Sequence, residues 1–186
     1  YGECIWVNKL MLPIINVVNE IVGFVGFDPF RYLEVHETNN ALLNYYTYST
    51  KSVMRKGDYL FCLAGTYKKA LRDGYLIITD GVFDSLSIAG EGFNSAALLG
   101  STVTDAIAAQ LRFIDRIIVP VDNDEAGIKL FEKLSVIHPN VIFVKQGKLK
   151  DADDILKTQF REKYVDGLTR AVKSSLPLSV MVNFRG

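Results

Sequence analysis

From residue 75 onward, short runs rich in β-branched residues alternate with stretches of helical pattern, and this alternation limits the fold more than any other feature. The predicted strands are residues 75–79, 95–99, 117–121 and 141–144, and the predicted helices are 82–90, 102–112 and 125–137. Continuous apolar strands separated by helices of ordinary length are typical of a parallel sheet covered on both faces. The sequence therefore predicts an α/β domain.

The chain upstream of this region has a different pattern. From Leu10, the runs LMLPII and IVGFVGF predict a β-hairpin joined by a short Asn-containing turn. Residues 28–50 predict irregular structure with a short helix at 41–46, and residues 67–72 predict a helix that Gly74 stops. We expect a mixed α+β subdomain here.

Downstream of Asp154 the pattern is helical to about Ser174, and the last residues predict a loose or truncated end. The whole chain is thus expected to have three parts: a mixed α/β subdomain over 1–73, the α/β domain over 74–154 and a helical segment over 155–186.

Charge is unevenly distributed along a chain that has 21 basic and 21 acidic residues in total. Residues 1–73 carry 8 basic and 7 acidic groups (+1), residues 74–154 carry 7 and 12 (−5), and residues 155–186 carry 6 and 2 (+4). This distribution is expected if carboxylates in the middle of the chain bind cations and residues of the flanking segments contact phosphates. A solvated acidic face would give the same charge count.

Cysteine spacing and hydropathy exclude several classes of protein. Cys4 and Cys62 are far apart and lack CxxC spacing, so the sequence predicts neither a zinc ribbon nor a disulfide framework. The apolar runs are too short for a membrane span, and no signal-peptide pattern opens the chain. We expect a soluble protein of a reducing cytoplasm, with no membrane partner. The chain starts with Tyr1 rather than Met, which leaves open that it is a piece of a longer protein.

Acidic residues follow three of the predicted strands. Ligands of an open parallel sheet collect outside the carboxyl ends of its strands, so these carboxylates are expected to face one site. The acidic positions are Asp80 and Asp84 after the first strand, Asp122 and Asp124 after the third, and Asp151 and Asp153 after the fourth. Like charges this close repel unless a cation neutralises them, and Mg²⁺ prefers such oxygen ligands. Any one of these aspartates could instead be a helix N-cap.

Four segments resemble, in order and spacing, the Toprim domain of replicative primases: LIITDGVFDSLSI, LLGSTVT, IIVPVDNDEAGIKL and GKLKDADDIL. That family has a Rossmann-like sheet, and its metal ions are surrounded by a glutamate and an aspartate four residues apart, a DxD pair and a later acidic pair. The resemblance maps these positions, in that order, onto Asp80, Asp84, Asp122, Asp124, Asp151 and Asp153. The chain departs from the family at position 80, where aspartate is one methylene shorter than glutamate.

The upstream segments NKLMLPI, VGFVGF, RYLEVHET and MRKGDYLFCLAGTYKKAL resemble the primase-specific region that precedes Toprim, whose basic residues line the path of template and nucleotide. The matching positions are Lys9, Arg31, Tyr32 and Lys56. The family's arginine after the second glycine of its GFGGR-like stretch is missing, because Phe27 follows Gly26.

The resemblance implies a DNA-directed RNA polymerase, a primase of bacterial or phage type. Such an enzyme is a nucleotidyltransferase that condenses ribonucleoside triphosphates into short RNA primers on single-stranded DNA for replication. It would use two or three Mg²⁺ or Mn²⁺ ions, with no zinc in this chain. The resemblance assigns the central metal ions and the catalytic role to Asp80, Asp122 and Asp124. It assigns the ions that accompany the nucleotide to Asp84, Asp151 and Asp153.

Two other functions remain open from the sequence. A Toprim nuclease would use the same carboxylates to activate water, and a non-catalytic Toprim module would bind a nucleotide or a partner. The aspartate at position 80 favours the latter, whereas the basic upstream segment and the other carboxylates favour an active primase. Because no zinc motif is present, a separate zinc-binding domain would read the initiation site, and a replicative helicase is a further candidate partner.

Overall fold

The computed structural model describes residues 4–38, 45–50, 52–100, 102–121, 125–145, 152–174 and 181–183. The chain forms two compact units, Tyr1–Arg55 and Lys56–Gly186. Within the described residues, the first unit has a three-stranded sheet and the second a six-stranded sheet.

An antiparallel hairpin forms the base of the first unit, as the sequence predicts. β1 (Leu10–Ile15) pairs with β2 (Ile21–Phe27), and β3 (Tyr46–Tyr48) pairs with the other edge of β2. In the hairpin turn, the side-chain oxygen of Asn16 accepts hydrogen bonds from the backbone N–H groups of Val18 and Glu20, at 3.1 and 2.9 Å. A single polar side chain thus fixes the turn.

A helix, α1 (Pro29–Thr38), occupies part of the segment for which we expected irregular structure. Proline suits the first helical position, and the preceding Asp28 caps the helix, because its Oδ1 accepts a hydrogen bond from the Arg31 backbone N–H at 3.1 Å. The expected short helix at 41–46 lies almost wholly outside the described residues, and Tyr46 begins β3 instead.

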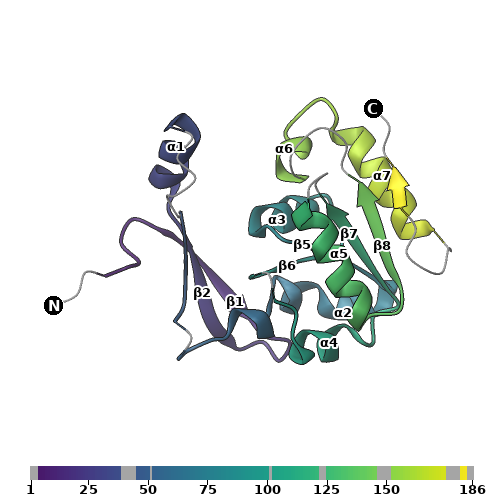
Figure 1. The fold of residues 1–186 in the computed structure, drawn as a ribbon, viewed down its shortest axis with the longest axis horizontal. Helices are drawn as coiled ribbons and strands as arrows, with labels where there is room; N and C mark the ends of the chain where they lie inside the picture. Colours follow the sequence, from purple (N-terminus) through teal and green to yellow (C-terminus); the bar gives the residue numbers. More distant parts are fainter. Residues whose placement is uncertain are drawn as a thin grey trace. The chain divides into compact units, whose positions relative to one another are not determined.

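The second unit is built on a mainly parallel sheet, as predicted. Its strands are β4 (Leu60–Phe61), β5 (Tyr75–Thr79), β6 (Ser95–Leu98), β7 (Arg116–Val121), β8 (Val141–Lys145) and β9 (Met181–Asn183). Their spatial order is β4-β6-β5-β7-β8-β9, in which β4 is antiparallel to β6 and the other pairs are parallel. Figure 1 labels the central strands β5 to β8.

Helices cover both faces of this sheet (Figure 1). They are a 3₁₀ turn η1 (Lys56–Asp58), α2 (Leu63–Asp73), α3 (Val82–Gly90), α4 (Asp105–Leu111), α5 (Glu125–Ile137), α6 (Ala152–Leu156) and α7 (Arg161–Lys173). Leu76 and Ile78 of β5 pack with residues of α2, α4 and α5, whereas Tyr75 and Ile77 pack with residues of α3, α6 and α7. Alternate residues of β5 therefore pack in two separate cores, because successive side chains of a strand point to opposite faces of the sheet.

Two features of the second unit differ from the sequence prediction. We expected a boundary after residue 73, but β4 and α2 lie in the second unit, because Leu60, Leu63 and Ala70 belong to its core. We expected a loose end after Ser174, but β9 pairs in parallel with β8 and extends the sheet.

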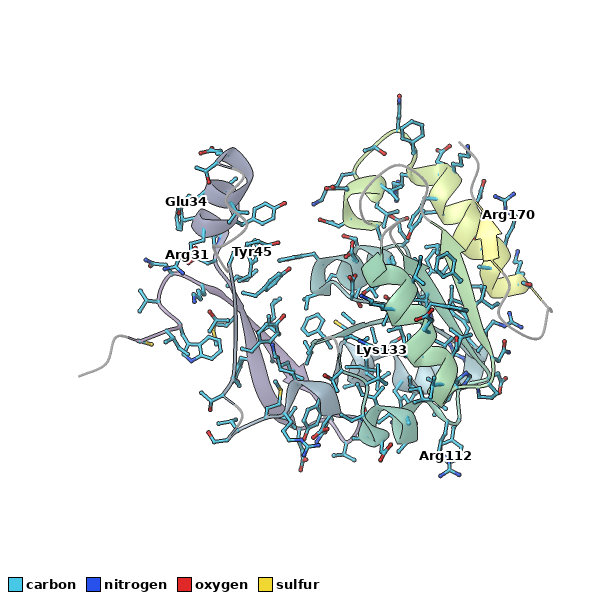
Figure 2. The ribbon with its side chains drawn as sticks, viewed as in Figure 1. Arg31, Glu34, Tyr45, Arg112, Lys133 and Arg170 are labelled. Carbon is cyan, nitrogen blue, oxygen red and sulfur yellow. The ribbon has the colours of Figure 1, made fainter. Side chains whose placement is uncertain are left out.

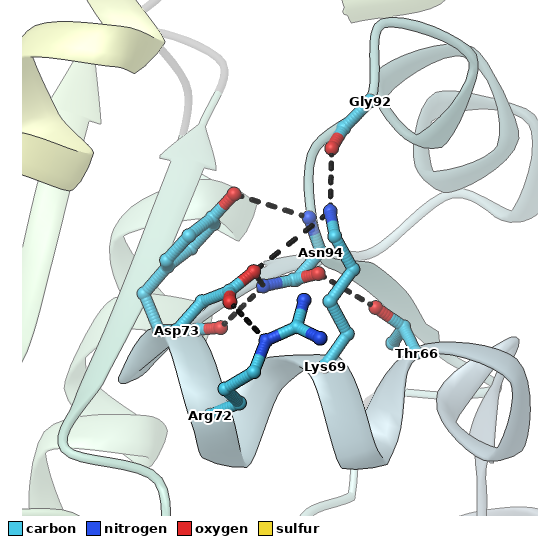
Figure 3. A network of polar contacts seen from close by, with 7 residues as sticks. Thr66, Lys69, Arg72, Asp73, Gly92 and Asn94 are labelled. Carbon is cyan, nitrogen blue, oxygen red and sulfur yellow. Dashed lines mark hydrogen bonds and ion pairs between the residues drawn. The ribbon is translucent and has the colours of Figure 1, made fainter.

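A polar network joins the end of α2 to the amino-terminal edge of the sheet (Figure 3). The fully buried Asn94 donates hydrogen bonds to Asp73 Oδ2 and to the Tyr75 carbonyl, at 3.2 and 3.4 Å, and accepts one from the Thr66 hydroxyl. Arg72 Nε donates to Asp73 Oδ1 at 3.0 Å. Each hydrogen-bonding group of the Asn94 side chain thus has a partner, which makes its burial tolerable.

None of the helices in the described part of the chain is long and apolar enough to cross a membrane.

Candidate metal centre

The path of the chain through the sheet reverses between β5 and β7. From β5 the chain passes through α3 to β6 on one side, and then through α4 to β7 on the other side of β5. α3 and α4 cover opposite faces, because Ile88 of α3 and Ile107 of α4 belong to different cores. Ligands of doubly wound sheets bind outside the carboxyl ends of the strands at such a switch point. The candidate site therefore lies where β5 and β7 end.

The sequence places acidic residues directly after both strands. Asp80 follows β5 and is exposed. Asp122 and Asp124 follow β7 in the sequence and, like Asp151, lie outside the described residues. Of the six predicted ligands, the structure describes Asp80, Asp84 and Asp153.

The turn between β5 and α3 sets the position of the first pair. Thr79 is buried, and its hydroxyl donates a hydrogen bond to the Gly81 carbonyl at 2.8 Å. Gly81 caps α3 with extended backbone, and Asp84 falls in the first turn of the helix. A carboxylate in that turn is stabilised by the exposed N–H groups and the dipole of the helix.

Gly81 leaves room for the carboxylate of Asp84. A Cβ atom added at Gly81 would lie 2.1 Å from Asp84 Oδ2, far inside van der Waals contact. Its backbone does not have positive φ, so the requirement for glycine here is one of space rather than of conformation. The sequence DGxxD is therefore physically coupled, because the glycine admits the aspartate that follows it.

The structure joins Asp84 to Asp153 across two helices. Asp84 Oδ1 accepts a hydrogen bond from the backbone N–H of Asp153 at 2.9 Å, which satisfies a first-turn N–H of α6. The Asp153 carboxylate accepts hydrogen bonds from the Ser87 hydroxyl and from Lys157 Nζ. Both aspartates are thus held by protein donors, and the α3–α6 contact keeps them together.

The described donors fit a hard divalent cation by their chemistry. All three are carboxylates, the oxygen ligands that Mg²⁺ and Mn²⁺ prefer, and the absence of a side chain at Gly81 leaves room for one of them, that of Asp84. Among the described residues, however, no three carboxylate, histidine or cysteine side chains gather closely enough to hold a metal ion. A complete ligand set would need the aspartates that follow β7.

The predicted template-contacting residues fall in both units. Lys9 donates a hydrogen bond to the Thr47 hydroxyl, which ties the segment before β1 to β3. Arg31 is exposed on α1 (Figure 2), and its Nε lies 3.8 Å from Asp28 Oδ2. Lys56 is exposed in η1, at the start of the second unit.

Tyr32 belongs to an aromatic cluster in the first unit. Its ring lies 5.5 Å from that of Phe27 and 5.3 Å from that of Tyr45, and Tyr45 in turn lies 4.9 Å from Tyr46. These contacts tie α1 to the sheet, so the rings of the cluster serve in packing. Burial, together with the nearby Tyr45, raises the pKa of the Tyr48 hydroxyl, so this group stays neutral at physiological pH.

Sequence reasoning missed Ser87 and Lys157. Both were detectable by spacing, because Ser87 is three residues after Asp84 on α3 and Lys157 is four residues after Asp153. What the spacing does not reveal is that both donors bind the same carboxylate, Ser87 from α3 and Lys157 from the turn after α6.

Fold and site together define a Toprim-like domain. Residues 77–156, from β5 to α6, match the family model described as Toprim-like. This segment contains the switch point and the six predicted carboxylates.

The likeness to known proteins extends well beyond this domain. A DNA primase of Rickettsia bellii is 29% identical over 188 residues, covering 94% of this chain and 28% of that protein. The Aquifex aeolicus primase, solved with its zinc-binding and RNA polymerase domains, is 26% identical with a TM-score of 0.74 and covers 95% of this chain and 42% of that one. A DnaG primase catalytic domain bound to single-stranded DNA, 19% identical, covers 88% of this chain and 51% of that one with a TM-score of 0.63. The chain thus has the sequence pattern and the fold of a Toprim-containing primase core, and spans less than a third of the length of the Rickettsia protein.

Proposed function

We propose that this chain is the catalytic core of a DNA primase, which joins ribonucleoside triphosphates into short RNA primers on single-stranded DNA. One observation carries the proposal: the likeness to primases covers 94% of the chain, including the first unit, whereas the Toprim-like segment covers only residues 77–156. A Toprim-like segment by itself would suit a nuclease equally well.

The carboxylates would perform the chemistry at the switch point. Asp80, Asp122 and Asp124 would bind the central metal ions, and Asp84, Asp151 and Asp153 those that accompany the nucleotide. Two such ions, when bound, lower the pKa of the attacking 3′-hydroxyl and neutralise the triphosphate. The contribution of the chain is to fix the carboxylates: the Asp153 N–H holds Asp84, for which Gly81 leaves room, and Ser87 holds Asp153.

The first unit, together with Lys56 of η1, would contact template and nucleotide. The second unit, which includes the helical segment 155–186, would hold the metal ions. Lys9, Arg31, Tyr32 and Lys56 are the proposed contacts to the template backbone or the triphosphate. A DnaG primase catalytic domain of this fold has been solved with single-stranded DNA bound, which supports single-stranded DNA as the template of this chain. A zinc-binding domain, like that solved in the Aquifex primase, would read the initiation site, and a helicase would be a further partner.

The test is an assay with end-labelled single-stranded DNA, labelled ribonucleotides and Mg²⁺ or Mn²⁺. The chain is compared with its Asp122→Asn variant and with Asp115→Asn. Asp115 is exposed and lies just before β7, so the control removes the same charge at the other end of the same strand.

We expect short RNA products from the wild type and from Asp115→Asn, and none from Asp122→Asn. Metal-dependent shortening of the DNA without RNA synthesis would replace the primase by a nuclease. Nucleotide binding without either reaction would make the chain a binding module.

A further inference from the structure

Asp153 has both carboxylate oxygens occupied by side chains of the protein. The Ser87 hydroxyl donates a hydrogen bond to Oδ1, and Lys157 Nζ lies 2.5 Å from Oδ2. Ser87 comes from α3, one turn after Asp84, while Lys157 comes from the turn that follows α6. The same carboxylate is therefore fixed by one neutral donor and one cation.

The two donors differ in how easily a metal ion would displace them. The Lys157 side chain is 68% exposed, whereas that of Asp153 is 21% exposed. An ammonium group on a long exposed side chain contributes little stability through such a pair, because water competes for both charges. Ser87 is partly buried on α3, which packs against α6, so its short side chain cannot move into solvent as the side chain of Lys157 can.

The ion pair of Asp153 with Lys157 lies next to the candidate metal centre. The backbone N–H of Asp153 is bonded to Asp84, the aspartate that Gly81 admits beside the end of β5. A cation that binds Asp153 through Oδ2 would compete there with the ammonium group of Lys157. Lys157 and a divalent ion are thus rivals for one oxygen atom.

We propose that Lys157 is an internal counter-ion that occupies Asp153 until a divalent metal ion displaces it, while Ser87 keeps the carboxylate oriented for that ion. The proposal rests on the proposed function in one respect, since it takes Asp153 as a metal ligand. Lys157 is then a positioning residue that sets the affinity for metal without contacting the nucleotide.

The experiment measures Mn²⁺ binding to the full chain by electron paramagnetic resonance of the free ion, without template or nucleotide. Lys157→Gln is expected to bind Mn²⁺ about two- to fivefold more tightly than the wild type, the change that loss of one weak competing ion pair allows. Lys173→Gln is the matched control, because it removes the same charge at the far end of α7. Ser87→Ala is expected to weaken Mn²⁺ binding, because Asp153 loses its fixed orientation.

Asp153→Asn decides whether the effect passes through this carboxylate. Combined with Asp153→Asn, the Lys157→Gln substitution is expected to give no gain. Equal affinity of Lys157→Gln and Lys173→Gln would overturn the proposal, as would a gain that survives Asp153→Asn or a wild type that binds no Mn²⁺. Urea unfolding of each variant confirms that it is folded. Failure of the primase proposal would appear separately, as Mn²⁺ binding with these affinities but no RNA product.

Discussion

At the scale of single residues, Asp80 is where the predicted metal ligands depart from the primase pattern, and it lies exposed at the end of the buried strand β5. If it is a catalytic ligand, Asp80→Asn should lower the initial rate of primer synthesis by about 100-fold or more, because the charge that holds the cation is lost. Asp80→Glu should keep the wild-type rate or exceed it, since it restores the side-chain length of the family. A fully active Asp80→Asn, or an Asp80→Glu as inactive as Asp80→Asn, would contradict this role.

Asp73 gives a residue-scale prediction about pH. Hydrogen bonds from Arg72 and then from Asn94 hold the pKa of the Asp73 carboxyl below its ordinary value of 3.8. A carboxyl whose pKa is lowered in the folded state stabilises the fold at any pH above its ordinary pKa. This stabilisation is lost as the pH falls through the lowered pKa. The difference in urea midpoint between wild type and Asp73→Asn should therefore be present at about pH 6 and shrink towards about pH 3. A difference that stays constant over this range would contradict the network of Figure 3.

At the scale of elements, the sequence predicted what periodicity encodes. The strand at 75–79 and the helices at 82–90 and 125–137 form where expected, because buried strands and amphipathic helices have different periods. Helix α1 was missed although Asp28 and Pro29 are good start signals, because its aromatic and charged residues show little period. β9 was missed because a three-residue edge strand depends on β8 for its hydrogen bonds.

The candidate site was predictable only in part, because some of its contacts depend on how the helices pack and not on a local sequence pattern. Its carboxylates stand after strands in the sequence, so their edge of the sheet follows from the topology. The contact of Ser87 with Asp153 comes from the packing of α3 on α6, which no local pattern specifies. The contact of Lys157 with Asp153 is local, because the two residues are four apart, but the spacing does not show that Asp153 also binds Ser87.

The join between α3 and α6 gives a prediction for these two elements. Gly81→Ala should push the Asp84 carboxylate away and break its hydrogen bond to the Asp153 N–H, because the new Cβ would lie 2.1 Å from Asp84 Oδ2. α6 is only five residues long and depends on such contacts, so the amide of Asp153 should exchange faster, with a loss of about 1 kcal/mol in the free energy of unfolding.

The matched control is Gly90→Ala at the other end of α3, where an added Cβ would meet no atom within 4 Å. That variant should leave the exchange of Asp153 unchanged. Equal exchange rates in Gly81→Ala and wild type would show that the carboxylate has room to move without releasing α6.

At the scale of the whole molecule, the two units differ in the size of their hydrophobic cores. Among the described residues, the buried apolar side chains of the first unit are Ile14, Val25 and Met54. The second unit buries two large clusters, one on each face of its sheet. The first unit, with so small a core, has only marginal stability by itself.

The difference in core size predicts how each unit behaves when expressed alone. Residues 56–186 should unfold cooperatively in urea, whereas residues 1–55 should show no cooperative transition by circular dichroism.

The same asymmetry separates metal binding from synthesis. The proposed metal ligands all lie in the second unit, whereas Lys9, Arg31 and Tyr32 lie in the first. Residues 56–186 alone should therefore bind Mn²⁺ with the affinity of the full chain but form no RNA on single-stranded DNA, because three of the four proposed contacts to template and nucleotide are missing and Lys56 alone remains. The full chain with Lys9 and Arg31 both changed to Gln is the folded control, and should likewise bind Mn²⁺ while losing most synthesis. RNA products from residues 56–186 would mean that the template is held by the second unit alone, and that the basic residues of the first unit serve only its fold.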